Sequence, residues 1–201
     1  MKAFRIFALC AFAALLSATA VGEEEWQAFL KVTPRGSETT TNKRGGGLIR
    51  PSSNSSRSSS RTLKQNMKWL AEVRYRGKNL PGKSELRVYY IGYRDASMKP
   101  VILKTEKHAL TLSETGTCTQ DLVSPTTRVT KSRSRSSNGS RGFTKSTSTT
   151  RGERIAGCIV QLLADGKIAR VWTSNSTWAK LAWEDPLTEA AFTRKAKNSL
   201  N

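Results

Sequence analysis

The sequence predicts a mainly β protein, a single antiparallel β-sandwich that ends in a short C-terminal helix. Two observations favour strands over helices: residues 63–76 alternate apolar and polar side chains with a period of two, and further short runs rich in Val, Ile and Tyr are separated by turn residues. The third observation is that a single segment, at the C-terminus, carries the signals that start a helix. Strands joined by turns without an internal repeat are typical of two packed antiparallel layers, and an antiparallel barrel is the competing architecture.

The clearest strand is the segment 63–76. Its odd positions, from Leu63 through Trp69 to Tyr75, are mostly apolar, whereas its even positions are mostly charged or polar, with Leu70 as the exception. This alternation predicts a long half-buried strand whose apolar face points inward and whose charged face lies in solvent. A shorter alternation from Trp26 to Val32 predicts a second strand.

Further strands follow along the chain. Residues 158–163 and 168–173 flank Asp165-Gly166, which is a strong signal for a tight hairpin between them. The other strand candidates are 86–93, which follows a turn signal at 79–82, and the shorter runs 101–103 and 108–112.

A helix is predicted over residues 185–198. Asp185-Pro186 supplies an N-cap and a first-turn proline, and the basic residues at the other end suit the helix dipole. The strands before it place the sandwich domain at 21–184, with immunoglobulin-like proportions.

Residues 1–20 have the features of a cleaved signal peptide. Lys2 and Arg5 form a charged start, residues 6–16 an apolar stretch too short to span a bilayer, and Ala18-Thr19-Ala20 a cleavage site. We therefore expect a secreted or periplasmic protein that begins near Val21 and keeps no transmembrane anchor after cleavage. Cys10 lies inside the apolar stretch rather than after it, which argues against a lipoprotein.

The positive charge is concentrated in two segments. The chain has 34 Lys and Arg against 15 Asp and Glu, a net charge of +19 that falls to +17 once Lys2 and Arg5 are removed. Residues 35–68 and 126–154 each carry eight basic residues and one acidic residue. The Ser/Arg-rich low-complexity segments 35–62 and 126–154 bury too little apolar surface to fold alone, so we expect a basic loop and a long basic hairpin that are mobile without a ligand.

These basic segments predict a surface for an anionic polymer. Arg offers phosphate or sulfate a planar fork of donors, and neutralising several anions together releases their counterions. The stretch from residue 35 to 66 has no aromatic side chain, so sequence-specific nucleic-acid recognition is not expected; the competing interpretation is that the charge only aids solubility. The predicted polyanion-binding residues are Arg44, Arg50, Arg57, Arg61, Arg128, Lys131, Arg133, Arg135, Arg141, Lys145 and Arg151.

The residue inventory does not favour an enzyme, a metal protein or a cofactor. One His and three Cys exclude a multi-ligand zinc or iron–sulfur site built from this chain alone. His108 is the one possible centre of His-dependent catalysis, but the sequence identifies no partner for it, so we expect a surface or rim histidine. Trp172, Trp178 and Trp183 are expected in the core or an interface, with stacking on sugar rings as the alternative.

Three stretches resemble a pattern in uncharacterised secreted bacterial β-sandwich proteins. They are 69–75, 86–91 and the hairpin segment 157–167, from Gly157-Cys158 to Gly166-Lys167, and the resemblance covers about half the mature chain. It implies an immunoglobulin-like fold and export, and it implies no catalytic residue.

Cys118 and Cys158 are predicted to form a disulfide, because export places them in an oxidising compartment. A basic hairpin with its tip at 136–140, centred on Asn138, pairs residues whose numbers add to 276, as 118 and 158 do. Opposed Cβ atoms on antiparallel strands lie about 4.5–5.5 Å apart, near the distance that a disulfide needs. The alternatives are a register shifted by a bulge near Pro125 and two unpaired buried thiols.

These features predict an exported, non-enzymatic binding or envelope protein whose basic arms hold an anionic polymer or surface. Candidate ligands are glycans that carry sulfate or sialic acid, lipopolysaccharide phosphates and extracellular nucleic acid. The alternative is a structural subunit of a surface appendage or envelope assembly, in which exposed strand edges pair with neighbouring protein subunits.

Overall fold

The computed structural model describes residues 26–45, 56–78, 80–97, 99–137 and 144–192. This part of the chain is mainly β, as predicted, and all of its strand pairs are antiparallel. The strands are β1 (Trp26–Gly45), β2 (Ser56–Gly77), β3 (Ser84–Arg94), β4 (Pro100–Ala109), β5 (Thr117–Val123), β6 (Thr127–Ser137), β7 (Thr144–Ala164) and β8 (Lys167–Thr173). Two 3₁₀ turns, η1 (Ser176–Trp178) and η2 (Leu181–Trp183), and a helical turn over 189–192 follow.

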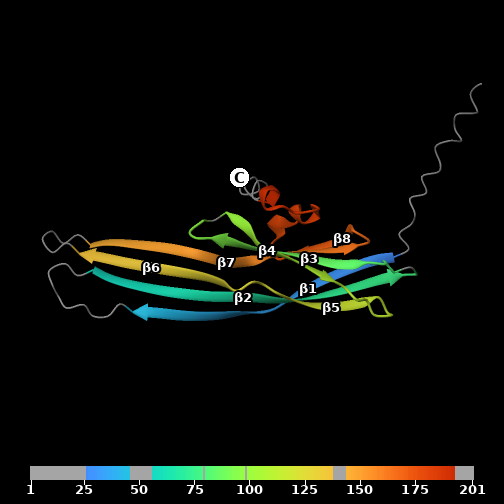
Figure 1. The fold of residues 1–201 in the computed structure, drawn as a ribbon, viewed down its shortest axis with the longest axis horizontal. Helices are drawn as coiled ribbons and strands as arrows, with labels where there is room; N and C mark the ends of the chain where they lie inside the picture. Colours follow the sequence, from blue (N-terminus) through green and yellow to red (C-terminus); the bar gives the residue numbers. More distant parts are fainter. Residues whose placement is uncertain (1–25, 46–55, 79, 98, 138–143, 193–201) are drawn as a thin grey trace, which may run out of the picture.

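The strands form one continuous sheet in the order β1-β2-β6-β7-β3-β4, with β5 beside β2 and β8 beside β7. The two longest strands each have two sets of neighbours. The first part of β2 pairs with β6 and its second part with β5; the first part of β7 pairs with β6 and its second part with β3 and β8. At one end of the molecule the sheet is therefore a single layer, and at the other end it divides into two (Figure 1).

We call the single-layer part the arm and the divided part the body. The arm consists of residues 36–45 of β1, 56–65 of β2, 127–137 of β6 and 144–152 of β7. In the body, β1-β2-β5 faces β4-β3-β7-β8 (Figure 1). The two layers are thus parts of a single sheet, joined through the arm, rather than two separate sheets.

The main core lies between the two layers of the body. β2 contributes Trp69, Val73 and Tyr75, the odd positions predicted to point inward, and all three are buried. Tyr90 of β3 and Val160 of β7 pack against them from the other layer. Burial of each large apolar side chain contributes roughly 1.5–3 kcal/mol, so the body holds most of the apolar stabilisation of the chain.

The hairpin between β7 and β8 confirms the Asp165-Gly166 prediction. These two residues have φ of 48° and 82°, the left-handed backbone that a two-residue hairpin turn requires. The short candidates 101–103 and 108–112 correspond to a single strand, β4, which ends at Ala109.

The basic segments form strands: β6 and β7 make the predicted long basic hairpin, whereas the described parts of 35–62 are strand rather than the predicted loop. Residues 36–45 pair with 59–68, and 129–137 pair with 144–152, so each basic segment contributes to a hairpin. Residues 56–65 of β2 then pair with 127–136 of β6, which joins the two hairpins edge to edge. Neither hairpin needs its own apolar core, because each extends strands that the body already holds, and Thr favours extended backbone.

The C-terminal segment covers the outer face of β3 and β7. Its Trp178, Leu181 and Phe192 are buried in a second core with Tyr89 and Ile91 of β3. β3 is therefore buried on both faces along 88–91, which explains why its sequence is continuously apolar there instead of alternating.

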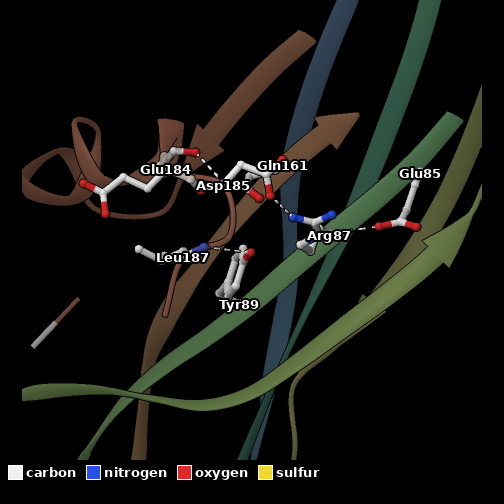
Figure 2. A network of polar contacts seen from close by, with 8 residues as sticks. Glu85, Arg87, Tyr89, Gln161, Glu184, Asp185 and Leu187 are labelled. Carbon is white, nitrogen blue, oxygen red and sulfur yellow. Dashed lines mark hydrogen bonds and ion pairs between the residues drawn. The ribbon is translucent and has the colours of Figure 1, made fainter. Parts of the chain in front are cut away.

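Polar contacts fix this segment to the sheet (Figure 2). The buried amide of Gln161 on β7 donates hydrogen bonds to the carbonyls of Ala182 (2.8 Å) and Glu184 (2.7 Å). Arg87 of β3 donates to the carboxylate of Asp185. Buried hydrogen-bonding groups are costly to leave unpaired, so these contacts define where the segment lies.

The predicted start of the C-terminal helix was wrong. Asp185-Pro186 is a turn, and the helical turn begins at residue 189. Thr188 caps it: its hydroxyl accepts from the N–H of Ala191 (3.2 Å) and its carbonyl accepts from the N–H of Phe192 (2.9 Å). The remainder of the predicted helix, 193–198, lies outside the described residues.

Candidate anion-binding surface

The arm brings together basic residues from two distant parts of the sequence. Its four strand segments contain eleven Lys and Arg residues and a single acidic residue, Glu38. The pairing of β2 with β6 places both sets of cations in one sheet. The two basic segments therefore converge, which the sequence alone left open.

Three cations lie side by side in one row across the arm. Lys43 of β1 is directly opposite Arg61 of β2, which is directly opposite Lys131 of β6. Directly opposed residues share a face, and neighbouring strands are about 4.8 Å apart, so the row spans only about 10 Å. All three side chains are exposed. Like charges opposite each other destabilise a sheet, so sheet stability does not account for this row.

Two arginines extend the row along β6. Arg133 and Arg135 lie two and four residues beyond Lys131, so the alternation of side chains places them on the same face. The Nε of Arg133 donates to the hydroxyl of Ser146 (3.2 Å), a neutral partner that leaves the positive charge uncompensated. We call this the row face. Its described members are Lys43, Arg61, Lys131, Arg133 and Arg135, and no carboxylate of the arm shares it.

The opposite face holds fewer contiguous cations and the one carboxylate of the arm. Lys64 and Arg128 are directly opposite each other there. Glu38 lies nearby, 2.6 Å from the Nζ of Lys68, and hydrogen bonds from Lys68 and Asn66 lower the pKa of its carboxyl. The described cations of the opposite face are Arg44, Lys64, Arg128 and Arg151.

Most of the predicted polyanion-binding residues lie on the arm. Arg44, Arg61, Arg128, Lys131, Arg133, Arg135 and Arg151 are exposed there, and the backbone of Arg57 and Lys145 lies in β2 and β7. Arg50 and Arg141 lie outside the described residues. The predicted binding residues leave out Lys43 and Lys64, although both belong to the basic segment 35–68. Only the strand register places them opposite Arg61 and Arg128.

His108 has a carboxylate partner that sequence reasoning missed. Its Nε2 lies 3.4 Å from Glu106, two residues earlier on β4 and hence on the same face. Glu106 also pairs with Lys104 (2.6 Å) and accepts a hydrogen bond from the hydroxyl of Tyr90 (3.1 Å). Burial raises the pKa of Glu106, but hydrogen bonds from Lys104 and Tyr90 outweigh it, so the pKa lies below its ordinary value. Lys104 and Glu106 thus form an ion pair beside the core, with Tyr90 and His108 next to them, and we call these four residues the ion-pair cluster.

The predicted disulfide does not form in the structure, where Cys118 and Cys158 are both free thiols. Paired residues of β6 and β7 have numbers that add to 281 instead of 276, so the register argument was wrong. Cys118 lies opposite Val73 of β2, and Cys158 lies opposite Tyr90 of β3. The reason is that β5 pairs with β2 in one layer, whereas this part of β7 belongs to the other layer.

The three late tryptophans have different environments. Trp178 is buried in the second core, and Trp172 is partly buried against the main core. Trp183 is 53% exposed. They do not form one aromatic face.

No protein-family model, curated protein or solved structure matches this chain. Among the described residues, no His, Cys, Asp and Glu side chains are grouped as a metal site would need. Nor does that part of the chain contain a helix long and apolar enough to cross a membrane.

Proposed function

We propose that this protein is an exported, non-enzymatic binding protein that holds an anionic polymer on the row face of its arm. The observation that carries the proposal is the row Lys43–Arg61–Lys131, in which three exposed cations are directly opposed on neighbouring strands. Such a row opposes folding on its own, and a ligand that neutralises it removes that repulsion.

The geometry favours a linear polymer over a small anion. Successive residues on one face of a strand are about 6.8 Å apart, and neighbouring strands about 4.8 Å apart. Lys131, Arg133 and Arg135 therefore extend along β6 at intervals comparable to the spacing of charges on an anionic chain. The row adds two cations beside Lys131.

The ligand class is a sulfated or phosphorylated polymer recognised by charge. The described residues of the arm include no aromatic side chain, so they offer no platform on which bases stack. Binding is expected to depend steeply on salt and little on sequence. The charged start and apolar stretch of residues 1–20 support an extracytoplasmic setting.

Two matched triple variants test the row face. Lys43→Gln/Arg61→Gln/Lys131→Gln removes one cation from each of β1, β2 and β6 on the row face, and Arg44→Gln/Lys64→Gln/Arg128→Gln removes one from each of the same strands on the opposite face. Binding of a DNA duplex of arbitrary sequence and of a heparin fragment is measured at several NaCl concentrations, with circular dichroism to check the fold.

For the duplex, the row variant is expected to lower the slope of log K against log salt by about 2–3 units, roughly one for each lost contact, and the control variant by less than one. Equal losses in the two variants contradict a row-face site. If the wild-type protein binds neither polymer at low salt, the proposed function is wrong. A preference for one polymer identifies which anion, sulfate or phosphate, the surface suits.

A further inference from the structure

The outer edge of β1 differs between the body and the arm. In the body, Arg170 of β8 donates a hydrogen bond to the carbonyl of Ala28 (2.9 Å), so β8 lies beside this half of the strand. A bulge between Pro34 and Gly36 then separates the two halves. Among the described residues, no strand pairs with the outer edge of 36–45, and this half contains no proline. A sheet edge of this kind is a template for another strand.

The other edge of the arm, on β7, is less available for pairing with a strand of another copy. Asp95, in the turn directly after β3, meets it at Gly152: its N–H donates to the Gly152 carbonyl (2.6 Å), and its side chain accepts from the Gly152 N–H (2.8 Å). If two copies of this edge paired about Ser148, Lys145 of each copy would lie opposite Arg151 of the other. Like charges opposed across strands disfavour that pairing.

We propose that two copies of this protein pair through residues 36–45 of β1, antiparallel about a two-fold axis at Thr41. In this register the numbers of opposed residues add to 82, so Glu38 of each copy faces Arg44 of the other. The remaining opposed positions are neutral or carry one charge, such as Thr40 with Asn42 and Thr39 with Lys43. Opposite charges directly across strands stabilise a sheet, and here the pair occurs twice.

The geometry allows two copies to pair in this way without a clash and to stop at a dimer. The arms run antiparallel, so the two bodies lie at opposite ends of an eight-stranded arm and do not meet. A two-fold axis perpendicular to the sheet keeps both row faces on the same side. Because the interface is isologous, it produces a dimer and does not propagate into a filament.

The charges of the arm do not prevent the pairing at physiological salt. At about 0.15 M ionic strength, the repulsion between exposed charges further apart than roughly 8 Å is largely screened. The attraction between Glu38 and Arg44 persists, because directly opposed side chains across strands lie about 5 Å apart. One oxygen of Glu38 already accepts from Lys68 (2.6 Å), but a carboxylate accepts several hydrogen bonds, so it also serves Arg44 of the second copy.

Cysteine cross-linking tests the register in a Cys10→Ser/Cys118→Ser background. Thr41→Cys places a thiol on the two-fold axis, opposite its own copy. Thr39→Cys, equally exposed and on the same face, places its thiol about four residues from its copy, or roughly 13 Å. Under mild oxidation we expect Thr41→Cys to form dimers at least tenfold faster than Thr39→Cys. Equal rates, or no dimer from Thr41→Cys, would overturn the proposal.

A charge swap tests the same pairing without cysteines. We expect Arg44→Glu to weaken the dimer about tenfold in sedimentation at 0.15 M NaCl, since two attractive pairs become repulsive. Glu38→Arg/Arg44→Glu restores both pairs and the net charge, so its dimer should return. If the double variant dimerises no more tightly than Arg44→Glu, the proposed register is wrong. No polyanion is added, so failure here leaves the proposed binding function intact, and failure of polyanion binding leaves the dimer intact.

Discussion

Arg61 of β2 and Lys131 of β6 lie directly opposite each other where the two basic hairpins join, and both are exposed. Like charges at such a position cost stability, roughly 0.2–1 kcal/mol relative to neutral residues. Lys43 on the other side of Arg61 adds a second unfavourable pair. A binding surface built this way is less stable than a neutral sheet of the same strands.

The first prediction follows from this cost. Arg61→Thr removes both like-charged pairs and inserts a β-favouring residue, so we expect the free energy of unfolding to rise by about 0.5–1.5 kcal/mol while polyanion affinity falls. Arg151→Thr is the control, because Arg151 faces the neutral Thr130 on β6. Urea titration of both variants measures the difference. An Arg61→Thr protein less stable than wild type would show that the row is not strained by its charges.

The second prediction concerns the junction of arm and body. Gly152 has φ of +106°, and a Cβ there would lie 2.0 Å from the carbonyl oxygen of Arg128 on β6. Backbone atoms cannot move aside as a side chain can, so Gly152→Ala is expected to lower the unfolding free energy by about 2–4 kcal/mol.

Gly36 provides the control for that change. It also has a positive φ, +135°, but no atom lies within 4 Å of a Cβ built on it. Gly36→Ala therefore carries backbone strain alone, about 1–2 kcal/mol. Thermal or urea unfolding that ranks Gly36→Ala as the more damaging change would contradict the close approach of β6 to β7.

The third prediction is a dependence of stability on pH through Glu106. Its pKa in the folded protein is lowered below the ordinary 4.5: burial alone raises it, but the hydrogen bonds from Lys104 and Tyr90 prevail. A carboxyl with a lowered folded pKa contributes stability that is fully present above its unfolded pKa and is lost as pH falls through the folded value. Glu106→Gln should therefore flatten the loss of stability below about pH 4.5.

Urea titrations between pH 3 and 7 measure that profile, with Glu114→Gln on the exposed loop before β5 as the control for loss of a charge. We expect Glu114→Gln to keep the wild-type shape. A Glu106→Gln profile parallel to that of wild type would show that this ion-pair cluster does not contribute to acid sensitivity.

The fourth prediction separates free thiols from a disulfide. Cys118 is partly exposed, whereas Cys158 is buried, and burial raises the pKa of its thiol to about 12. In a Cys10→Ser chain, a thiol reagent at pH 8 should modify one cysteine quickly and the second only after unfolding. Absence of any reactive thiol, even in denaturant, would mean that the two cysteines are bonded to each other.

The sequence by itself determined the strands that contact the core. The alternation along 63–76, the Asp165-Gly166 turn and the apolar run of β3 all appear as β2, the β7–β8 hairpin and β3. Each is a local signal, because a residue's backbone preference or a two-residue period of apolar side chains reflects burial on one face. Such a signal can be recognised without knowledge of the rest of the chain. The concentration of basic charge in two segments was visible for the same reason.

Only the tertiary structure decided that those segments are strands and that they meet. Strand signals require apolar residues to alternate, and the arm half of β2 has polar residues instead, so its pattern stops at Leu63 although the strand begins at Ser56. Pairing β2 with β6 joins residues 62 to 80 positions apart, a separation that no local sequence pattern reports. The register also places Cys118 and Cys158 on different partner strands, and it aligns Lys43, Arg61 and Lys131 in one row. Sequence reasoning could not predict either result, because the whole sheet, rather than nearby residues, sets the partner and the offset of a strand.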